Sequence, residues 1–140
     1  MFILDTDTIT HDQNGHALLK GKIRRTSSQH LFTTSITLEE QLKGRLAYLN
    51  KYRRDPRKSA HVHAALVQTV RYFQAWNILL FNHEADRLFR QLQKQRIRIG
   101  TQDLRIAATA LLYGFTVVTV NVRDFAQVPD LTVEDWTSSS

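Results

Sequence analysis

The chain has 140 residues, and 19 Lys and Arg against 13 Asp and Glu give it a formal net charge of +6. That length predicts one domain with a single core, and the excess of positive charge favours a polyanionic partner, either nucleic acid or an acidic protein. The absence of cysteine excludes disulfides, thiolate zinc sites and cysteine nucleophiles. Because neither a signal peptide nor an apolar run of roughly 20 residues is recognisable, we expect a cytoplasmic protein outside the membrane.

Short apolar runs predict buried strands, and apolar residues at helical spacing predict helices between them. The expected strands cover residues 2–4, 31–35, 78–81, 115–120 and 131–133, and the expected helices cover 14–25, 37–52, 59–76, a stretch that Asn82 caps, and 101–113 with Gly114 at its end. We expect a single domain over residues 1–137, followed by a disordered tail over 138–140.

Alternation of short strands with helices indicates a parallel sheet that is covered on both faces. The predicted fold class is therefore α/β, a three-layer α/β/α sandwich with a short, mainly parallel central sheet. Ligands of such folds bind beyond the carboxyl ends of the strands.

Acidic residues follow several of the predicted strands or open the helices after them. They are Asp5, Glu39, Glu40, Asp103 and Asp124. At one edge of a parallel sheet these carboxylates would repel one another. A divalent cation removes that conflict, and oxygen ligands suit Mg²⁺ or Mn²⁺.

Each carboxylate also has a simpler interpretation. Thr37 and Glu40 fit a capping box at the start of a helix, Asp103 fits the positive end of another helix, and Asp124 fits a turn. Asp5 is the hardest to explain in this way, because an acid that ends a buried strand is costly without a partner.

Five segments, taken in order, match the signature of one known family. The first three are MFILDTDT at residues 1–8 for L-D-T-[ND], TLEEQLKG at 37–44 for T-x-x-E-x-x-x-G, and IGTQDLRIAA at 99–108 for I-G-x-x-D-x-x-I-A-A. The last two are VVTVNVRDF at 117–125 for L-V-T-x-N-x-R-[DE]-F, and VPDLTVEDW at 128–136 for V-P-G-L-x-x-E-[DN]-W. The chain thus resembles PIN-domain ribonucleases, in particular the VapC-type toxins of toxin–antitoxin pairs.

The resemblance implies a Mg²⁺-dependent endoribonuclease, with Mn²⁺ as a possible substitute, that acts on tRNA or ribosomal RNA. It also implies a homodimer and inhibition by a cognate antitoxin protein. The family's catalytic residues carry over to Asp5, Glu40, Asp103 and Asp124, of which Asp5, Asp103 and Asp124 would bind metal. Thr6, Asp7, Thr101 and Asn121 would position these groups or the substrate. Either Asn121 or Asp124 is the nearer metal ligand.

Basic residues near the predicted acidic edge are candidates for contacts with RNA phosphates. They are Lys43, Arg96, Arg98 and Arg105. The apolar stripe from Val62 to Trp76 is a candidate dimer interface. Two alternatives remain: a DNA-structure-specific Mg²⁺ nuclease, and a PIN-fold module that binds RNA or protein without activity.

Overall fold

The central sheet of the computed structural model, which describes residues 1–139, consists of five parallel strands in the order β3-β2-β1-β4-β5. The strands are β1 (Phe2–Leu4), β2 (Leu31–Thr34), β3 (Asn77–Leu79), β4 (Thr116–Val118) and β5 (Val133–Glu134). The helices are α1 (Thr6–Gln13), α2 (Ala17–Arg25), the 3-10 turn η1 (Ser28–His30), α3 (Ser35–Tyr52), α4 (Ser59–Gln74), α5 (His83–Gln93), α6 (Thr101–Tyr113) and α7 (Val122–Phe125). The predicted α/β sandwich is confirmed.

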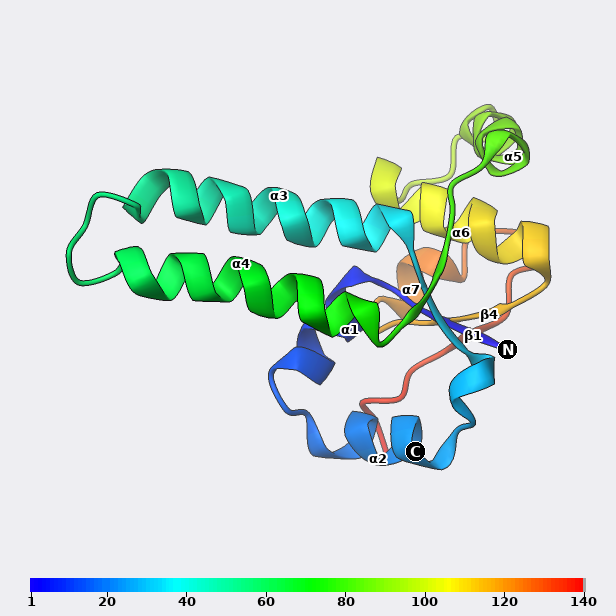
Figure 1. Cartoon of the computed structure of the whole chain (residues 1–140). Helices are drawn as coiled ribbons and strands as arrows, with labels where there is room; N and C mark the ends of the chain where they lie inside the picture. The colour runs from blue at the N-terminus through cyan, green and yellow to red at the C-terminus, as the bar shows by residue number, and fades with distance from the viewer. Residues whose placement is uncertain (140) are drawn as a thin grey trace.

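Alternate residues of each strand enter two separate cores, one on each face of the sheet. Ile3 and Val117 pack with α5, α6 and α7 on one face. Their neighbours Leu4 and Val118 pack with α1, α2 and α4 on the other. This division forms the three layers of the sandwich, and the central strand β1 is buried between both cores (Figure 1).

Helices α3 and α4 form a long antiparallel hairpin that extends away from the sheet (Figure 1). Ile36, in the first turn of α3, and Phe73, in the last turn of α4, anchor the base of the hairpin in the two cores. The other end of the hairpin therefore lies well away from the sheet. None of the helices within residues 1–139 has the length and apolar character needed to span a membrane.

The structure corrects three predicted boundaries in the first part of the chain. The helix expected over residues 14–25 begins only at Ala17, as α2, and it is preceded by α1, a helix that was not predicted and that begins at Thr6 because the Asp5 side chain caps it. Gly15, at a φ of +82°, lies in the turn that separates α1 from α2. Helix α3 begins at Ser35 rather than Thr37, since Thr34 is its N-cap and accepts from the Thr37 amide.

Later boundaries differ by a few residues. The strands expected over 78–81, 115–120 and 131–133 occupy 77–79, 116–118 and 133–134, and the short helix α7 follows β4 where only a turn was considered. The prediction of a disordered tail over 138–140 falls partly on Ser140, which lies outside the described residues.

Candidate active site

Asp5 follows β1 and is held in one orientation by its neighbours. One carboxylate oxygen accepts from the Thr8 amide at 3.0 Å, and the other accepts from the Thr119 hydroxyl at 2.6 Å. The side chain is 1% exposed. Burial raises the pKa of Asp5, whereas the hydrogen bonds from Thr119 and Thr8 lower it. Asp5 thus ends a buried strand with a preoriented carboxylate, and each oxygen keeps a lone pair for a further contact.

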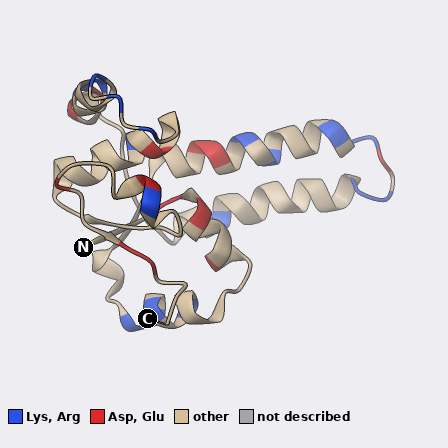
Figure 2. Cartoon of the chain, turned by 180° about the vertical axis from the view of Figure 1, so that it is seen from behind, with Lys and Arg blue, Asp and Glu red and all other residues tan. Residues whose placement is uncertain are grey.

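Asp103, in the first turn of α6, lies among the other predicted acids. Partial burial, followed by the negative charge of Asp5, Asp7, Glu40 and Asp124, raises the pKa of Asp103 to about 6. These five side chains come from α1, α3, α6, α7 and the end of β1, and the acidic segments gather near the base of the hairpin in Figure 2. The predicted convergence of acids at the carboxyl edge of the sheet is therefore present.

Glu40 has a different local role from the one that the capping-box interpretation assigned to it. Because Thr34 is the N-cap of α3, Glu40 lies in the second turn of the helix and is too far along to serve that cap, which a capping box would pair with the third residue after it. Its Oε1 instead accepts from the Thr6 hydroxyl at 2.7 Å, and Thr6 also contacts the Thr37 hydroxyl at 3.0 Å. The Thr37–Glu40 capping box is therefore wrong, and Glu40 is left to serve the acidic site.

Two of the predicted site residues, Asn121 and Asp124, follow β4. Asn121 is the N-cap of α7, but its side chain makes no capping bond, and its backbone N–H donates to the Thr119 hydroxyl at 2.9 Å. Asp124 is half-buried within α7. Thr119 therefore joins Asp5 to the segment that carries Asn121 and Asp124. Its role was not predicted, although its place at the end of an apolar strand within the quoted motif was a usable signal.

The remaining predicted site residues lie at the rim of the site or in its supports. Asp7 and Thr101 are exposed in the first turns of α1 and α6. Lys43 is exposed and lines a shallow hollow with Glu39, Glu40 and Gln102.

The predicted RNA-binding arginines have different surroundings. Arg105 donates to Gln102 at 2.7 Å and stacks on the Phe89 ring at 4.6 Å, so part of its guanidinium is already engaged. Arg96 and Arg98 are exposed between α5 and α6, with Arg96 at a positive φ of 53°.

No three Asp, Glu or His side chains among residues 1–139 are arranged as a preformed metal cage. Mg²⁺ does not require one, because it usually keeps several waters and takes one or two carboxylates together with substrate phosphates. Burial and then the negative charge of the other acids raise the pKa of Asp103, and a set of oxygen donors with such uncompensated charge fits such an ion.

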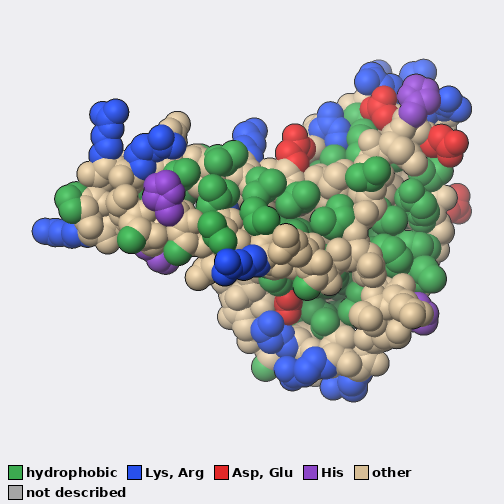
Figure 3. Space-filling view, viewed as in Figure 1, with side chains coloured by type: hydrophobic (Ala, Val, Ile, Leu, Met, Phe, Trp, Pro, Cys, Tyr) green, Lys and Arg blue, Asp and Glu red, His purple; other side chains and the backbone are tan. Residues whose placement is uncertain are grey.

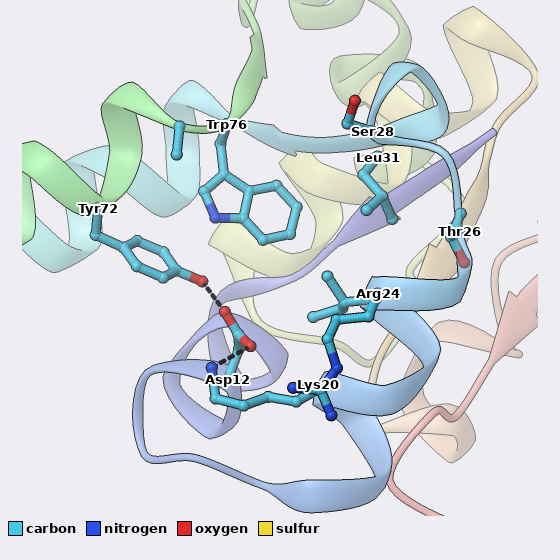
Figure 4. A pocket seen from close by; sticks show the side chains of 10 residues that line it. Asp12, Lys20, Arg24, Thr26, Ser28, Leu31, Tyr72 and Trp76 are labelled. Atoms are coloured by element: carbon cyan, nitrogen blue, oxygen red, sulfur yellow. Dashed lines mark hydrogen bonds and ion pairs between the residues drawn. The ribbon is translucent and has the colours of Figure 1, made fainter.

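A separate hollow of about 600 Å³ lies among α1, α2 and α4 (Figure 4). Asp12 is buried there, and its two oxygens accept from Lys20 at 3.0 Å and from the Tyr72 hydroxyl at 2.6 Å. Because both oxygens are paired, this network ties α1, α2 and α4 together. It is a structural link and plays no part in the acidic site.

Comparison with known proteins places the chain in a family. The profile described as PIN domain matches residues 2–131. Ribonuclease VapC1 of Rickettsia felis is 49% identical over 47 residues, which are 34% of this chain and 35% of that protein. Ribonuclease VapC of Rickettsia bellii is 50% identical over 42 residues, 30% of this chain and 31% of that protein, so the matched stretches span about a third of these relatives.

A solved structure extends the likeness over the whole fold. VapBC-1 from nontypeable Haemophilus influenzae superposes with a TM-score of 0.77 at 24% identity, covering 98% of each chain. At that identity the likeness shows the fold, and the match of the profile to nearly the whole length shows the family. The chain belongs to the PIN-domain family.

Proposed function

We propose that this protein is a Mg²⁺-dependent endoribonuclease and the toxin component of a toxin–antitoxin pair. The observation that carries the proposal is the convergence of Asp5, Asp7, Glu40 and Asp124 on Asp103, in a chain of the PIN-domain family. The relatives from Rickettsia, which bear the name Ribonuclease VapC, support RNA as the substrate.

Asp5, Asp103 and Asp124 would hold the metal ion. When bound, Mg²⁺ supplies an activated water and stabilises negative charge on the scissile phosphate. The Thr8 amide and the Thr119 hydroxyl fix the Asp5 carboxylate, so that its remaining lone pairs point in one direction. The Thr6 hydroxyl restrains one carboxylate oxygen of Glu40. The second oxygen of Glu40 would then be available to orient the attacking water and to accept a proton from it. No covalent intermediate is needed.

An antitoxin partner is supported by the structural relatives, which are complexes named VapBC. The net charge of +6 suits an acidic segment of such a partner. A homodimer remains part of the proposal, and Leu46, Val67 and Val70 on the hairpin are exposed apolar residues that a partner subunit would cover.

The proposal is tested by cleavage of total RNA and of structured DNA by the purified protein, with Mg²⁺, with Mn²⁺ and with EDTA. We expect RNA cleavage that EDTA abolishes and Mg²⁺ restores, while circular dichroism stays unchanged because the two apolar cores hold the fold. Cleavage that persists in excess EDTA contradicts the metal mechanism. Cleavage of DNA alone identifies a DNA nuclease instead.

The matched variant is Asp5→Asn. Asparagine is also a good N-cap, so its amide oxygen can still accept from Thr8 and α1 should remain folded. The charge that the metal needs is lost, and we expect no RNA cleavage from a folded protein. Cleavage at the wild-type rate by Asp5→Asn would leave an RNA- or protein-binding module without activity at this site as the better description.

A further inference from the structure

A hollow of about 480 Å³ adjoins the acidic site along the hairpin and has no place in the mechanism above. Glu40, Gly44 and Tyr48 follow one another at intervals of four residues, so they lie on one face of α3. His61 of α4 closes the other side of the hollow. A side chain at Gly44 would begin to fill this space, since a Cβ built there meets nothing within 4 Å. The hollow is thus open from Glu40 to the aromatic rings.

Aromatic rings form the end of the hollow that is farthest from the acids. The Tyr48 and His61 rings meet edge to face, with centroids 6.4 Å apart, and the Tyr48 and Tyr52 centroids are 5.0 Å apart. His61 is exposed and Tyr48 half-buried. The Arg45 guanidinium, which also lines the hollow, is held by a bond to the Thr69 hydroxyl at 3.0 Å. A planar, apolar ligand group would find ring faces and edges here.

Cations continue the same surface toward the tip of the hairpin. Lys58 Nζ lies 4.0 Å from the centre of the Tyr52 ring, and Lys51 Nζ lies 5.2 Å from it. Further basic side chains gather around the loop between the helices, where the far end of the hairpin is blue in Figure 3. They are Arg53, Arg54 and Arg57. From Glu40 to Lys51, α3 rises roughly 17 Å, which is longer than one nucleotide.

The surface formed by Gly44, Arg45, Tyr48, Lys51, Tyr52, Lys58 and His61 is called the hairpin track below. Rings interleaved with cations are the chemistry that binds single-stranded nucleic acid, because bases stack on the rings and phosphates contact the cations. An acidic peptide would match the cations but would leave the rings without stacking partners.

We propose that the hairpin track binds the unpaired stretch of RNA next to the cleaved bond, with one base against Tyr48 and His61 and later phosphates near Lys51 and Lys58. The inference rests on the proposed nuclease function and adds to it. It predicts that the protein cuts next to an unpaired base, at a fixed number of nucleotides from the position that stacks on the track.

The first test is the cleavage of an unstructured RNA oligonucleotide that the wild-type protein cuts at one position. We expect Tyr48→Ala and His61→Ala each to raise KM about tenfold, the effect of losing one stacked base, with kcat within about twofold. Tyr48→Phe keeps the ring and should behave as wild type. Tyr113→Ala, an exposed aromatic on α6 outside the track, is the matched control.

The second test separates stacking from a structural role of Tyr48. The same oligonucleotide is made with one abasic site, which is moved through each position flanking the cut. At one position the abasic substrate should raise the wild-type KM about tenfold, and Tyr48→Ala should then add no further effect. A Tyr48→Ala defect of equal size on every abasic substrate overturns the stacking assignment.

The third test concerns the cations. We measure the binding of a fluorescein-labelled 12-nucleotide oligouridylate by anisotropy in EDTA over a range of salt. The double variant Lys51→Gln/Lys58→Gln should make the slope of log affinity against log salt shallower by about 0.7 for each cation removed. The double variant Arg71→Gln/Arg87→Gln carries the same charge change outside the track and should keep the wild-type slope.

The outcomes distinguish this inference from the proposed function. If the wild type cuts no RNA but binds the oligouridylate, and Tyr48→Ala weakens that binding, the nuclease proposal fails and the track stands. If the wild type cuts RNA and all track variants match it in KM and binding, the track is wrong and the nuclease proposal stands. Track variants that cut normally but resist the antitoxin assign the surface to that protein and also overturn the inference.

Discussion

Replacing Asp103 by asparagine should make the metal-free protein more stable while removing its activity. The carboxyl of Asp103 is partly buried and surrounded by four other acids, which together raise its pKa to about 6. Among residues 1–139 no hydrogen bond to its side chain offsets that repulsion. Asparagine is nearly the same size and carries no charge, so the variant relieves the repulsion without leaving a cavity.

The size of the effect follows from the pKa. A rise from 3.8 to about 6 corresponds to roughly 3 kcal/mol between the two protonation states. Because Asp103 is only half-buried, solvent and salt screen part of this interaction. We expect a gain of about 1–2 kcal/mol in the free energy of unfolding at pH 7.5, or roughly 3–8 °C in Tm for a chain of this length.

The pH dependence of the gain has a definite sign. Asp103 has a folded-state pKa above its unfolded value, so its favourable contribution to stability is present below about pH 4 and is lost as the pH rises through about 6. The asparagine side chain of the variant does not titrate. The difference in Tm between Asp103→Asn and wild type should therefore be near zero at pH 4 and reach its full size above pH 7.

The assay is thermal melting in EDTA from pH 4 to pH 8 at low salt. Glu84→Gln, which removes an exposed acid in the first turn of α5, is the control and should show little dependence on pH. Added Mg²⁺ should stabilise the wild type through binding and leave Asp103→Asn nearly unchanged. A variant that melts at or below wild type at pH 7.5 would show that the acids do not repel one another.

Three further predictions concern single positions, Glu40, Thr119 and Gly114. Glu40→Gln should lose roughly 100-fold in cleavage rate but change the free energy of unfolding by less than about 1 kcal/mol, since the glutamine amide oxygen can still accept from Thr6. The control Glu39→Gln should cleave at the wild-type rate. If Glu39→Gln loses cleavage and Glu40→Gln keeps it, the functional glutamate lies one residue earlier. Thr119→Val should lower the free energy of unfolding, measured with denaturant, by about 1.5–3 kcal/mol, because it removes the hydrogen bond to Asp5. A loss of less than about 0.5 kcal/mol would exclude that hydrogen bond. Gly114→Ala should lower the free energy of unfolding by about 1 kcal/mol and leave cleavage unchanged. The reason is the φ of +71° at Gly114, since an added Cβ would meet no atom within 4 Å. A stability equal to that of the wild type would contradict the left-handed conformation at the end of α6.

The elements that could be predicted from the sequence have local signals that agree with one another. Helix α6 has the predicted bounds, because its apolar face starts and stops where Gly100 and Gly114 interrupt it. Asn82 accepts from Ala85 and caps α5 as expected. The acids at the ends of β1 and β4 could be placed at one edge because parallel strands share that edge.

The features that could not be predicted depend on contacts between distant segments. Helix α1 has few apolar residues and only a weak amphipathic pattern, and it exists because Asp5 caps it and Ile9 enters the core behind β1. The true cap of α3 was missed because Thr37 precedes Glu40 at the spacing of a capping box, whereas Thr34 has no glutamate three residues later. Only the length of β2 decides between them, and that length is set by its pairing with β1 and β3.

Asp5 and Asp103 differ in how they are held within the acidic site, for which residues 1–139 provide no preformed metal cage. Asp5 is fixed by Thr8 and Thr119 from two directions, so its position is set before any ion arrives. The Asp103 side chain has no such restraint within residues 1–139 and can turn toward an ion that brings its own waters. The repulsion that we expect to lower stability without metal is therefore the same property that would favour binding of the proposed cation. Substitution of Asp103 should accordingly gain stability as it loses function, whereas loss of the supporting Thr119 should reduce both.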